Sequence, residues 1–193
     1  MITEKGNNLH WNYFLALDDD AANLARYVEF SKANFDTYSI EMARLLMSAS
    51  SEVDVVAKML CKKINTNCSA NNIDDYRTII KPVFPGLIHH TIAIPRFGLE
   101  LLPWQNWGSD KNPDWWRDYN SVKHDRNSNY IKANLSNTLN SIAGLFSMLL
   151  FCYKEEAENG ELIPIPRTFG VPEDKFSGVS IDSKGLTYHY NFD

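Results

Sequence analysis

The sequence has few cysteines, no excess of basic residues and no apolar run long enough to cross a membrane. The three cysteines among 193 residues are far apart and form no Cys-x-x-Cys pair, so the sequence indicates neither a disulfide framework nor a zinc site. The longest mostly apolar stretch, residues 142–153, is about half a membrane span, and no signal-peptide core follows Met1. We therefore expect a cytoplasmic protein with no bound metal, no cofactor and no membrane partner.

The net charge of -5 argues against a nucleic-acid partner, because binding to phosphates requires an excess of Lys and Arg. The charge is unevenly distributed, however. Residues 1–54 hold nine acidic and four basic residues, residues 55–153 hold seven and eleven, and residues 154–193 hold eight and four. A basic middle section therefore lies between two acidic flanks.

The length and the 44% share of hydrophobic residues indicate one globular domain with its own core. We expect a helical domain over residues 1–160, which contains an irregular, proline-rich insert at about 82–111. A C-terminal extension over residues 161–193 follows it.

The first half of the chain has the spacing of amphipathic helices. Apolar positions recur every three or four residues between Asp20 and Ala49, which predicts one long helix whose start is marked by Asp18, Asp19 and Asp20. The small polar run 48–51 is expected to interrupt this pattern before a second helix over 53–64. A loop rich in Asn and Ser is expected at 65–72.

The insert begins after a short predicted helix over 74–81. Four prolines then exclude any long helix across the next thirty residues; they are Pro82, Pro85, Pro95 and Pro103. The best candidates for strands in this stretch are residues 91–94 and 97–102.

Helical signals return at Asn112-Pro113-Asp114, where we expect Asn112 to cap a helix that ends near His124 or Arg126. The polar residues 127–129 are expected to bend or break the chain. A strongly apolar stripe then runs from Ile131 to Tyr153. In the extension, 179–181 and 186–190 predict a β-hairpin.

The helix that starts near Asp114 is predicted to have two distinct faces. At 100° per residue, Trp115, Tyr119 and Val122 form a buried stripe. Arg117 and His124 lie within about 20° of each other on the opposite side, separated by roughly 10.5 Å along the axis, and Asn120 and Ser121 lie between them. We call these four residues the polar ridge. An arginine and a histidine on one face are suited to hold a phosphate.

The segment Arg117-Asp-Tyr-Asn-Ser-Val-Lys-His124 resembles the Arg-x(4–6)-His motif of the HEPN superfamily, including the polar residue that follows the arginine. The run Tyr-Asn-x-x-Lys-His-Asp-Arg at 119–126 is also similar to uncharacterised bacterial members. The resemblance covers Asp20 to Lys154. It implies an up-and-down helical bundle and a metal-independent endoribonuclease that acts as a homodimer, in a toxin or anti-phage setting where an antitoxin or other regulatory protein is a natural partner.

The resemblance also implies roles for individual residues. His124 is the general acid or base and Arg117 clamps the phosphate oxygens during attack by a 2′-hydroxyl, which leaves a 2′,3′-cyclic phosphate. Asn120 orients the phosphate or the histidine. The residues Lys123, Arg126 and Ser121 are expected to contact RNA.

Several alternatives stay open at this point. The spacing of Arg117 and His124 is also that of an ordinary solvated face, and HEPN-like domains include inactive modules that bind proteins or nucleotides. Asp118 and Asp125 flank the polar ridge and oppose RNA binding by their charge. Near the start of the expected second helix, the run 51–54 either places a carboxylate against Arg117 or caps that helix.

Other conspicuous residues have a structural interpretation that we favour. The tryptophans Trp104, Trp107, Trp115 and Trp116 can stack on bases but are more often part of a core or a dimer contact. The histidines outside the motif, which are His10, His89, His90 and His189, are expected in core packing or at the surface, because no set of metal ligands accompanies them.

Overall fold

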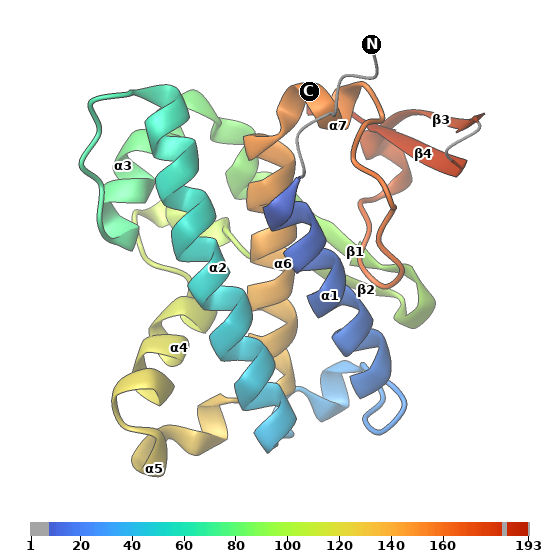
Figure 1. Cartoon of the computed structure of the whole chain (residues 1–193). Coiled ribbons are helices and arrows are strands. Elements are labelled where there is room, and N and C mark those ends of the chain that lie inside the picture. The colour runs from blue at the N-terminus through green and yellow to red at the C-terminus, as the bar shows by residue number, and fades with distance from the viewer. Residues whose placement is uncertain (1–7, 183–184, 193) are drawn as a thin grey trace.

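The computed structural model describes residues 8–182 and 185–192. The described chain is mainly helical, with seven α-helices and a C-terminal antiparallel β-hairpin (Figure 1). This confirms the expected mainly α class and the expected hairpin.

Two long helices form the centre of the bundle: α2 (Ile40–Ile64) and α6 (Leu135–Cys152). They make the most extensive contact between any two elements. Helix α1 (Leu9–Leu24) and helix α4 (Asp114–His124) lie on either side of this pair, and each contacts both members (Figure 1). Helix α3 (Ile73–Val83) packs against α2.

The prediction of one helix from Asp20 to Ala49 was wrong. The chain forms α1 and α2 instead, joined by residues 25–39 with a 3-10 turn at Lys32–Asn34. Asp18 is not near a helix start but in the second half of α1, where it is buried. The true start of α2 is capped by Ser39, whose hydroxyl accepts a hydrogen bond from Met42 N at 3.1 Å.

The small polar run 48–51 does not interrupt α2. Ala49 and Ser50 are fully buried in the middle of this helix. Neither Ala nor Ser breaks a helix, and Ala has the highest helix propensity of all residues. The run 48–51 therefore consists of small residues inside α2 and does not mark the end of this helix.

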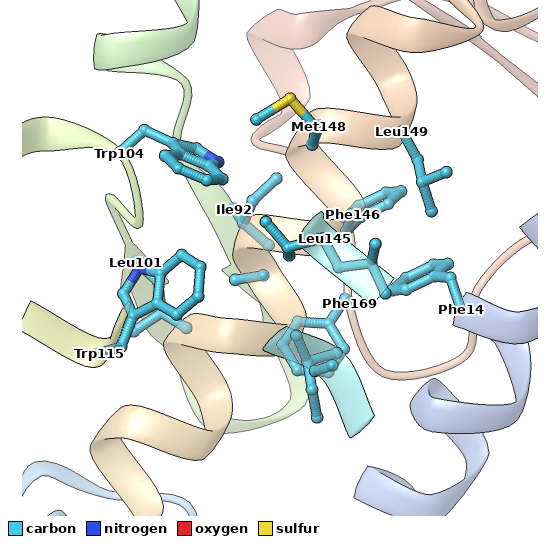
Figure 2. Packing of buried hydrophobic residues seen from close by; sticks show 14 of the residues in the cluster. Phe14, Ile92, Leu101, Trp104, Trp115, Leu145, Phe146, Met148, Leu149 and Phe169 are labelled. Atoms are coloured by element: carbon cyan, nitrogen blue, oxygen red, sulfur yellow. The ribbon is translucent and has the colours of Figure 1, made fainter. Parts of the chain in front are cut away.

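The segment 82–111 is irregular, as expected, and holds the short strands β1 (Ile92–Ile94) and β2 (Leu99–Leu101) in an antiparallel pair. Between them Gly98 has a φ of 59°, a left-handed conformation that glycine adopts at low cost. The segment belongs to the core, because Ile92, Trp104 and Trp107 are fully buried. Figure 2 shows Ile92, Leu101 and Trp104 packed beside residues of α6.

Helix α4 ends at His124 as predicted, but Asn112 does not cap its start. Pro113 occupies the cap position, and Asn112 Oδ1 instead accepts a hydrogen bond from Arg77 Nη1 at 2.7 Å. The polar residues after α4 form the short helix α5 (Arg126–Asn129), which is followed by a 3-10 turn at Tyr130–Lys132.

Helix α6 begins later than the apolar stripe suggested. Asn134 caps it, because its side-chain oxygen accepts a hydrogen bond from Asn137 N at 2.9 Å. Ile131 lies before this cap and is 63% exposed. Contrary to the expectation from the apolar run 142–153, α6 is long and apolar enough to cross a membrane, and it is the one described helix of this kind. Because 89% of it is buried inside the protein, its place in the core explains its apolar character.

Helix α7 (Lys154–Glu158) is the last element before residue 160, and the C-terminal extension that follows consists of a loop and the hairpin of β3 (Phe176–Asp182) and β4 (Gly185–Tyr190). Tyr190 is buried, with its ring centroid 6.3 Å from that of Phe146 on α6. The extension therefore docks on the helical bundle. Its hairpin lies at the end of the molecule away from α4 and α5, while its loop runs back toward α1 (Figure 1).

Candidate functional site

Helix α4 has the two faces that its sequence predicts. Trp115, Tyr119 and Val122 are buried against the bundle. Trp115 Nε1 donates a hydrogen bond to Pro103 O at 2.9 Å, and the ring centroid of Trp115 lies 5.4 Å from that of Trp104. All four clustered tryptophans, including Trp107 and Trp116, are buried, which confirms the core interpretation.

On the other face, Arg117 and His124 are exposed to solvent. The Arg117 side chain is 65% exposed and forms an ion pair with Asp114, one turn earlier in α4. His124 makes no hydrogen bond or ion pair with any residue that the structure describes. The side chain of His124 therefore stabilises the described fold through no hydrogen bond or ion pair.

The two middle residues of the polar ridge are held by contacts within the fold. Ser121 Oγ donates a hydrogen bond to Arg117 O at 3.1 Å and accepts one from Lys132 Nζ at 3.1 Å. Asn120 is half-buried, and its Nδ2 donates to Trp116 O at 3.0 Å. The side chain of Asn120 therefore leans toward Trp116 and away from the line between Arg117 and His124.

The two acidic residues beside the ridge are also engaged. Asp118 Oδ1 lies 3.3 Å from Lys132 Nζ, and Asp118 Oδ2 accepts a hydrogen bond from Asn137 Nδ2 at 3.0 Å. Asp125 caps α5 by accepting a hydrogen bond from Ser128 N, and its hydrogen bonds with Ser128 lower the pKa of the Asp125 carboxyl. The charge of Asp118 is compensated by Lys132, whereas Asp125 has no cationic partner among the described residues, so the objection that it repels RNA stands.

Positive charge remains at the end of α4. Lys123 and Arg126 are exposed, and neither has a carboxylate partner among the described residues. The ammonium of Lys123 lies 5.5 Å from the centroid of the Tyr119 ring. The acidic flanks lie only partly away from this face. Helix α1 is on the other side of the α2–α6 pair and the β-hairpin is at the far end of the bundle (Figure 1), but Asp54 of α2 lies beside Asn120 and Lys123 of α4.

Both interpretations of the run 51–54 were wrong, because it lies in the middle of α2. Glu52 Oε1 is 2.5 Å from His10 Nδ1. Asp54 accepts hydrogen bonds from Lys58 Nζ at 2.5 Å and from Tyr76 Oη at 2.7 Å. Neither carboxylate caps a helix or pairs with Arg117.

The histidines outside the motif lie in the core or at the surface, as expected. His90 is buried, with Nδ1 2.9 Å from Ser147 Oγ, and burial lowers its pKa to about 4. His189 Nδ1 lies 3.0 Å from Glu158 O, whereas His89 is exposed. No group of His, Cys, Asp and Glu within the described residues is arranged to hold a metal ion.

The three cysteines are free. Burial raises the pKa of the Cys61 thiol to about 12 and that of Cys152 to about 11. Because the thiolate is the nucleophile, these two residues are poor candidates for covalent chemistry.

A cavity that the sequence did not predict lies beside the polar ridge. It has a volume of about 400 Å³ and is lined by residues of α2, the start of α3 and α4. Asn120 and Lys123 are part of this lining, and they face Lys58 and Asn71 from other elements. No local pattern indicates this cavity, because it depends on how α2 and α4 pack.

No family model matches the chain, and neither the curated proteins nor the solved structures contain a significant match to it.

Proposed function

We propose that the protein is a metal-independent endoribonuclease of HEPN type, with His124 and Arg117 at its catalytic site. The observation that carries this proposal is the exposed His124, whose side chain makes no hydrogen bond or ion pair with a described residue and which shares a face of α4 with Arg117. A histidine whose two ring nitrogens are both engaged in the fold is not free to move protons, because one nitrogen must reach the substrate. His124 has no such restraint within the described residues.

The reaction requires proton transfer and compensation of negative charge. The 2′-oxygen attacks the phosphorus, the bond from phosphorus to the 5′-oxygen breaks, and a 2′,3′-cyclic phosphate remains. A base removes the proton of the 2′-hydroxyl, and an acid protonates the leaving 5′-oxygen. A histidine side chain is able to serve as either the base or the acid, and the guanidinium of Arg117 stabilises the charge on the phosphorane.

A homodimer is part of the proposal. One chain supplies a single motif histidine, whereas the reaction uses both a base and an acid. Arg117 and His124 are also roughly 10.5 Å apart along the axis of α4, since they are separated by seven residues. A second copy related by a two-fold axis brings another Arg117 and His124 to the same phosphate.

The neighbouring residues have supporting roles. Lys123 and Arg126 attract the RNA backbone without regard to sequence. Asn120 contacts the substrate from the side of the cavity, and Ser121 contacts it only if its hydroxyl exchanges a present partner for a phosphate oxygen.

The test is cleavage of a single-stranded RNA in the presence of EDTA, with analysis of the product ends. We expect 2′,3′-cyclic phosphate or 3′-phosphate ends, and we expect His124→Ala to abolish cleavage. His89→Ala is the matched control, because His89 is also exposed but lies outside the motif. Cleavage that persists in His124→Ala removes His124 from the mechanism.

The assembly is tested separately by sedimentation of the wild-type protein. A histidine-modifying reagent then measures whether His124 is accessible in the assembly. A dimer in which both His124 side chains are shielded from this reagent supports the shared site. A monomer that still cleaves RNA contradicts this part of the proposal.

The second candidate function is a binding module without catalytic activity. The ion pair between Arg117 and Asp114 favours it, because a phosphate must compete with a carboxylate for the guanidinium. This module would bind a protein or a nucleotide, and a well-folded wild-type protein that does not cleave RNA supports it.

A further inference from the structure

The cavity beside the polar ridge has walls from three separate parts of the chain. Its volume of about 400 Å³ is within the usual range for sites that bind small ligands. Six of its lining residues carry the inference, and they are Ser51 and Lys58 from α2, Asn71 before α3, and Trp116, Asn120 and Lys123 from α4.

The lining is suited to a polar ligand. It offers the hydroxyl of Ser51 and three amide side chains, those of Asn71, Asn72 and Asn120. The amide nitrogens of Asn71 and Asn72 already donate within the fold, to Ser69 O and Asp75 Oδ2, whereas the Ser51 hydroxyl makes no hydrogen bond with a described residue. Asn120 uses its Nδ2 to donate to Trp116 O, and its side-chain oxygen accepts no hydrogen bond within the described chain. Such unused donors and acceptors are suited to read the edge of a base, whereas an apolar ligand would leave them without partners.

The charge of the cavity favours an anionic ligand. Lys58 Nζ is 2.5 Å from Asp54 Oδ2, so these two charges compensate each other. Lys123 is the remaining charged residue of the lining, and it has no carboxylate partner among the described residues. The cavity therefore carries one uncompensated positive charge at its boundary with the polar ridge.

Helical geometry places the cavity directly beside the proposed catalytic face. Trp116, Asn120 and Lys123 lie within about 60° of one another around α4. The direction midway between Arg117 and His124 is about 80° from the middle of this group. Lys123 immediately precedes His124, so a ligand that extends from the cavity past Lys123 reaches His124.

We propose that this cavity binds one nucleotide of a single-stranded RNA, next to the phosphate that is cleaved. The side-chain oxygens of Asn71 and Asn120 accept hydrogen bonds from the edge of the base, since their amide nitrogens already donate to Ser69 O and Trp116 O. Trp116 lies beneath the base, and Lys123 contacts the phosphate that leads toward His124. This inference rests on the proposed ribonuclease function, but it concerns binding and is tested by binding.

The experiment fills the cavity from its exposed side. Ser51→Trp places a large side chain in the cavity without removing a contact of the fold, because Ser51 is exposed. Val55→Trp is the matched control, since Val55 is 44% exposed, lies four residues later on α2 and does not line the cavity. Both changes are made in the His124→Ala protein so that the RNA stays intact.

The probes are fluorescein-labelled oligouridylate and oligoadenylate of about ten nucleotides, which is within the range that one binding module covers. Fluorescence anisotropy measures the affinity, and circular dichroism checks the fold. We expect Ser51→Trp to weaken binding of at least one probe by about tenfold or more. We expect Val55→Trp to bind both probes as the His124→Ala parent does.

The outcomes separate this inference from the proposed function. If wild-type protein cleaves RNA but Ser51→Trp binds as tightly as Val55→Trp, the cavity is not a nucleotide site although the ribonuclease proposal stands. If wild-type protein does not cleave RNA but Ser51→Trp alone weakens binding, the cavity binds a nucleotide and the ribonuclease proposal fails. Absence of binding to both probes overturns the inference.

Discussion

Asp18 and Thr168 are joined by hydrogen bonds across 150 positions of the chain. Thr168 N donates to both oxygens of the Asp18 carboxylate, at 3.0 and 3.1 Å, and Thr168 Oγ1 donates to Asp18 O at 3.2 Å. Arg167 N and Phe169 N donate to the same carboxylate. This contact fastens the loop before the β-hairpin to α1.

We expect Asp18→Asn to lower the free energy of unfolding by about 2 kcal/mol. Asparagine keeps one acceptor oxygen, but its NH2 group is placed against a backbone N–H of the loop, so a buried donor loses its partner. Urea unfolding followed by tryptophan fluorescence measures the change. Asp19→Asn, an exposed neighbour on α1, is the control and should change stability little. Equal effects of the two variants contradict the role assigned to Asp18.

His90 gives the stability a pH dependence. Burial lowers its folded-state pKa to about 4, from an unfolded value of 6.5. The unfolded chain therefore binds more protons between these values, and the stability present above about pH 6.5 is lost as the pH falls toward about 4. Between about pH 7 and about pH 5, we expect His90 to account for a loss of about 2 kcal/mol.

Urea unfolding at both pH values tests this, with His90→Gln as the comparison. Glutamine retains a polar group near Ser147 Oγ but does not titrate. The wild-type protein should lose more stability on acidification than the variant. Parallel losses in the two proteins show that His90 is not the responsible group.

Gly144 determines how closely α4 approaches α6. A Cβ atom at this position would lie 2.9 Å from Cζ2 of Trp115, which is fixed by its hydrogen bond to Pro103 O. We expect Gly144→Ala to lower the stability by about 1 to 2 kcal/mol, because the strain of overpacking exceeds the gain in helix propensity. Gly170→Ala is the control, since a Cβ there meets no atom within 4 Å. Urea unfolding of both variants measures the difference, and a stabilised Gly144→Ala protein would contradict the close approach.

The parts of the fold that the sequence predicts correctly have local causes. The stripe of Trp115, Tyr119 and Val122 follows from helical spacing alone, and the exposure of Arg117 and His124 follows from the same geometry. In the sequence, turn-forming residues separate the strand-forming runs 179–181 and 186–190, and this local pattern is enough to predict the β-hairpin. These features need no knowledge of which elements pack together.

The errors arise where a residue serves a distant contact. Asp18 has the character of a helix N-terminal charge, but its partners lie in the loop at 167–169. Val28 and Phe35 fit the spacing of a helix although they lie in the loop 25–39, because both pack against the core from that loop. The cavity beside α4 was missed for the same reason, since it depends on the packing of α2 against α4.

The ion pair between Arg117 and Asp114 yields a test of which group on α4 contacts the phosphate. If Arg117 clamps the phosphate, the carboxylate of Asp114 competes with the substrate for its guanidinium. Exposed pairs of this kind contribute up to about 1 kcal/mol. We therefore expect Asp114→Asn to tighten RNA binding by about two- to fivefold in the His124→Ala background.

The matched control is Asp118→Asn, which removes the same charge from the same helix but leaves Arg117 paired. Anisotropy with labelled single-stranded RNA compares the two variants, and circular dichroism checks that α4 keeps its start without Asp114. A larger gain for Asp114→Asn than for Asp118→Asn assigns the phosphate contact to Arg117, because only the first change releases its guanidinium. Equal gains mean that net charge alone governs the affinity, and Arg117 then has no specific role in binding the phosphate.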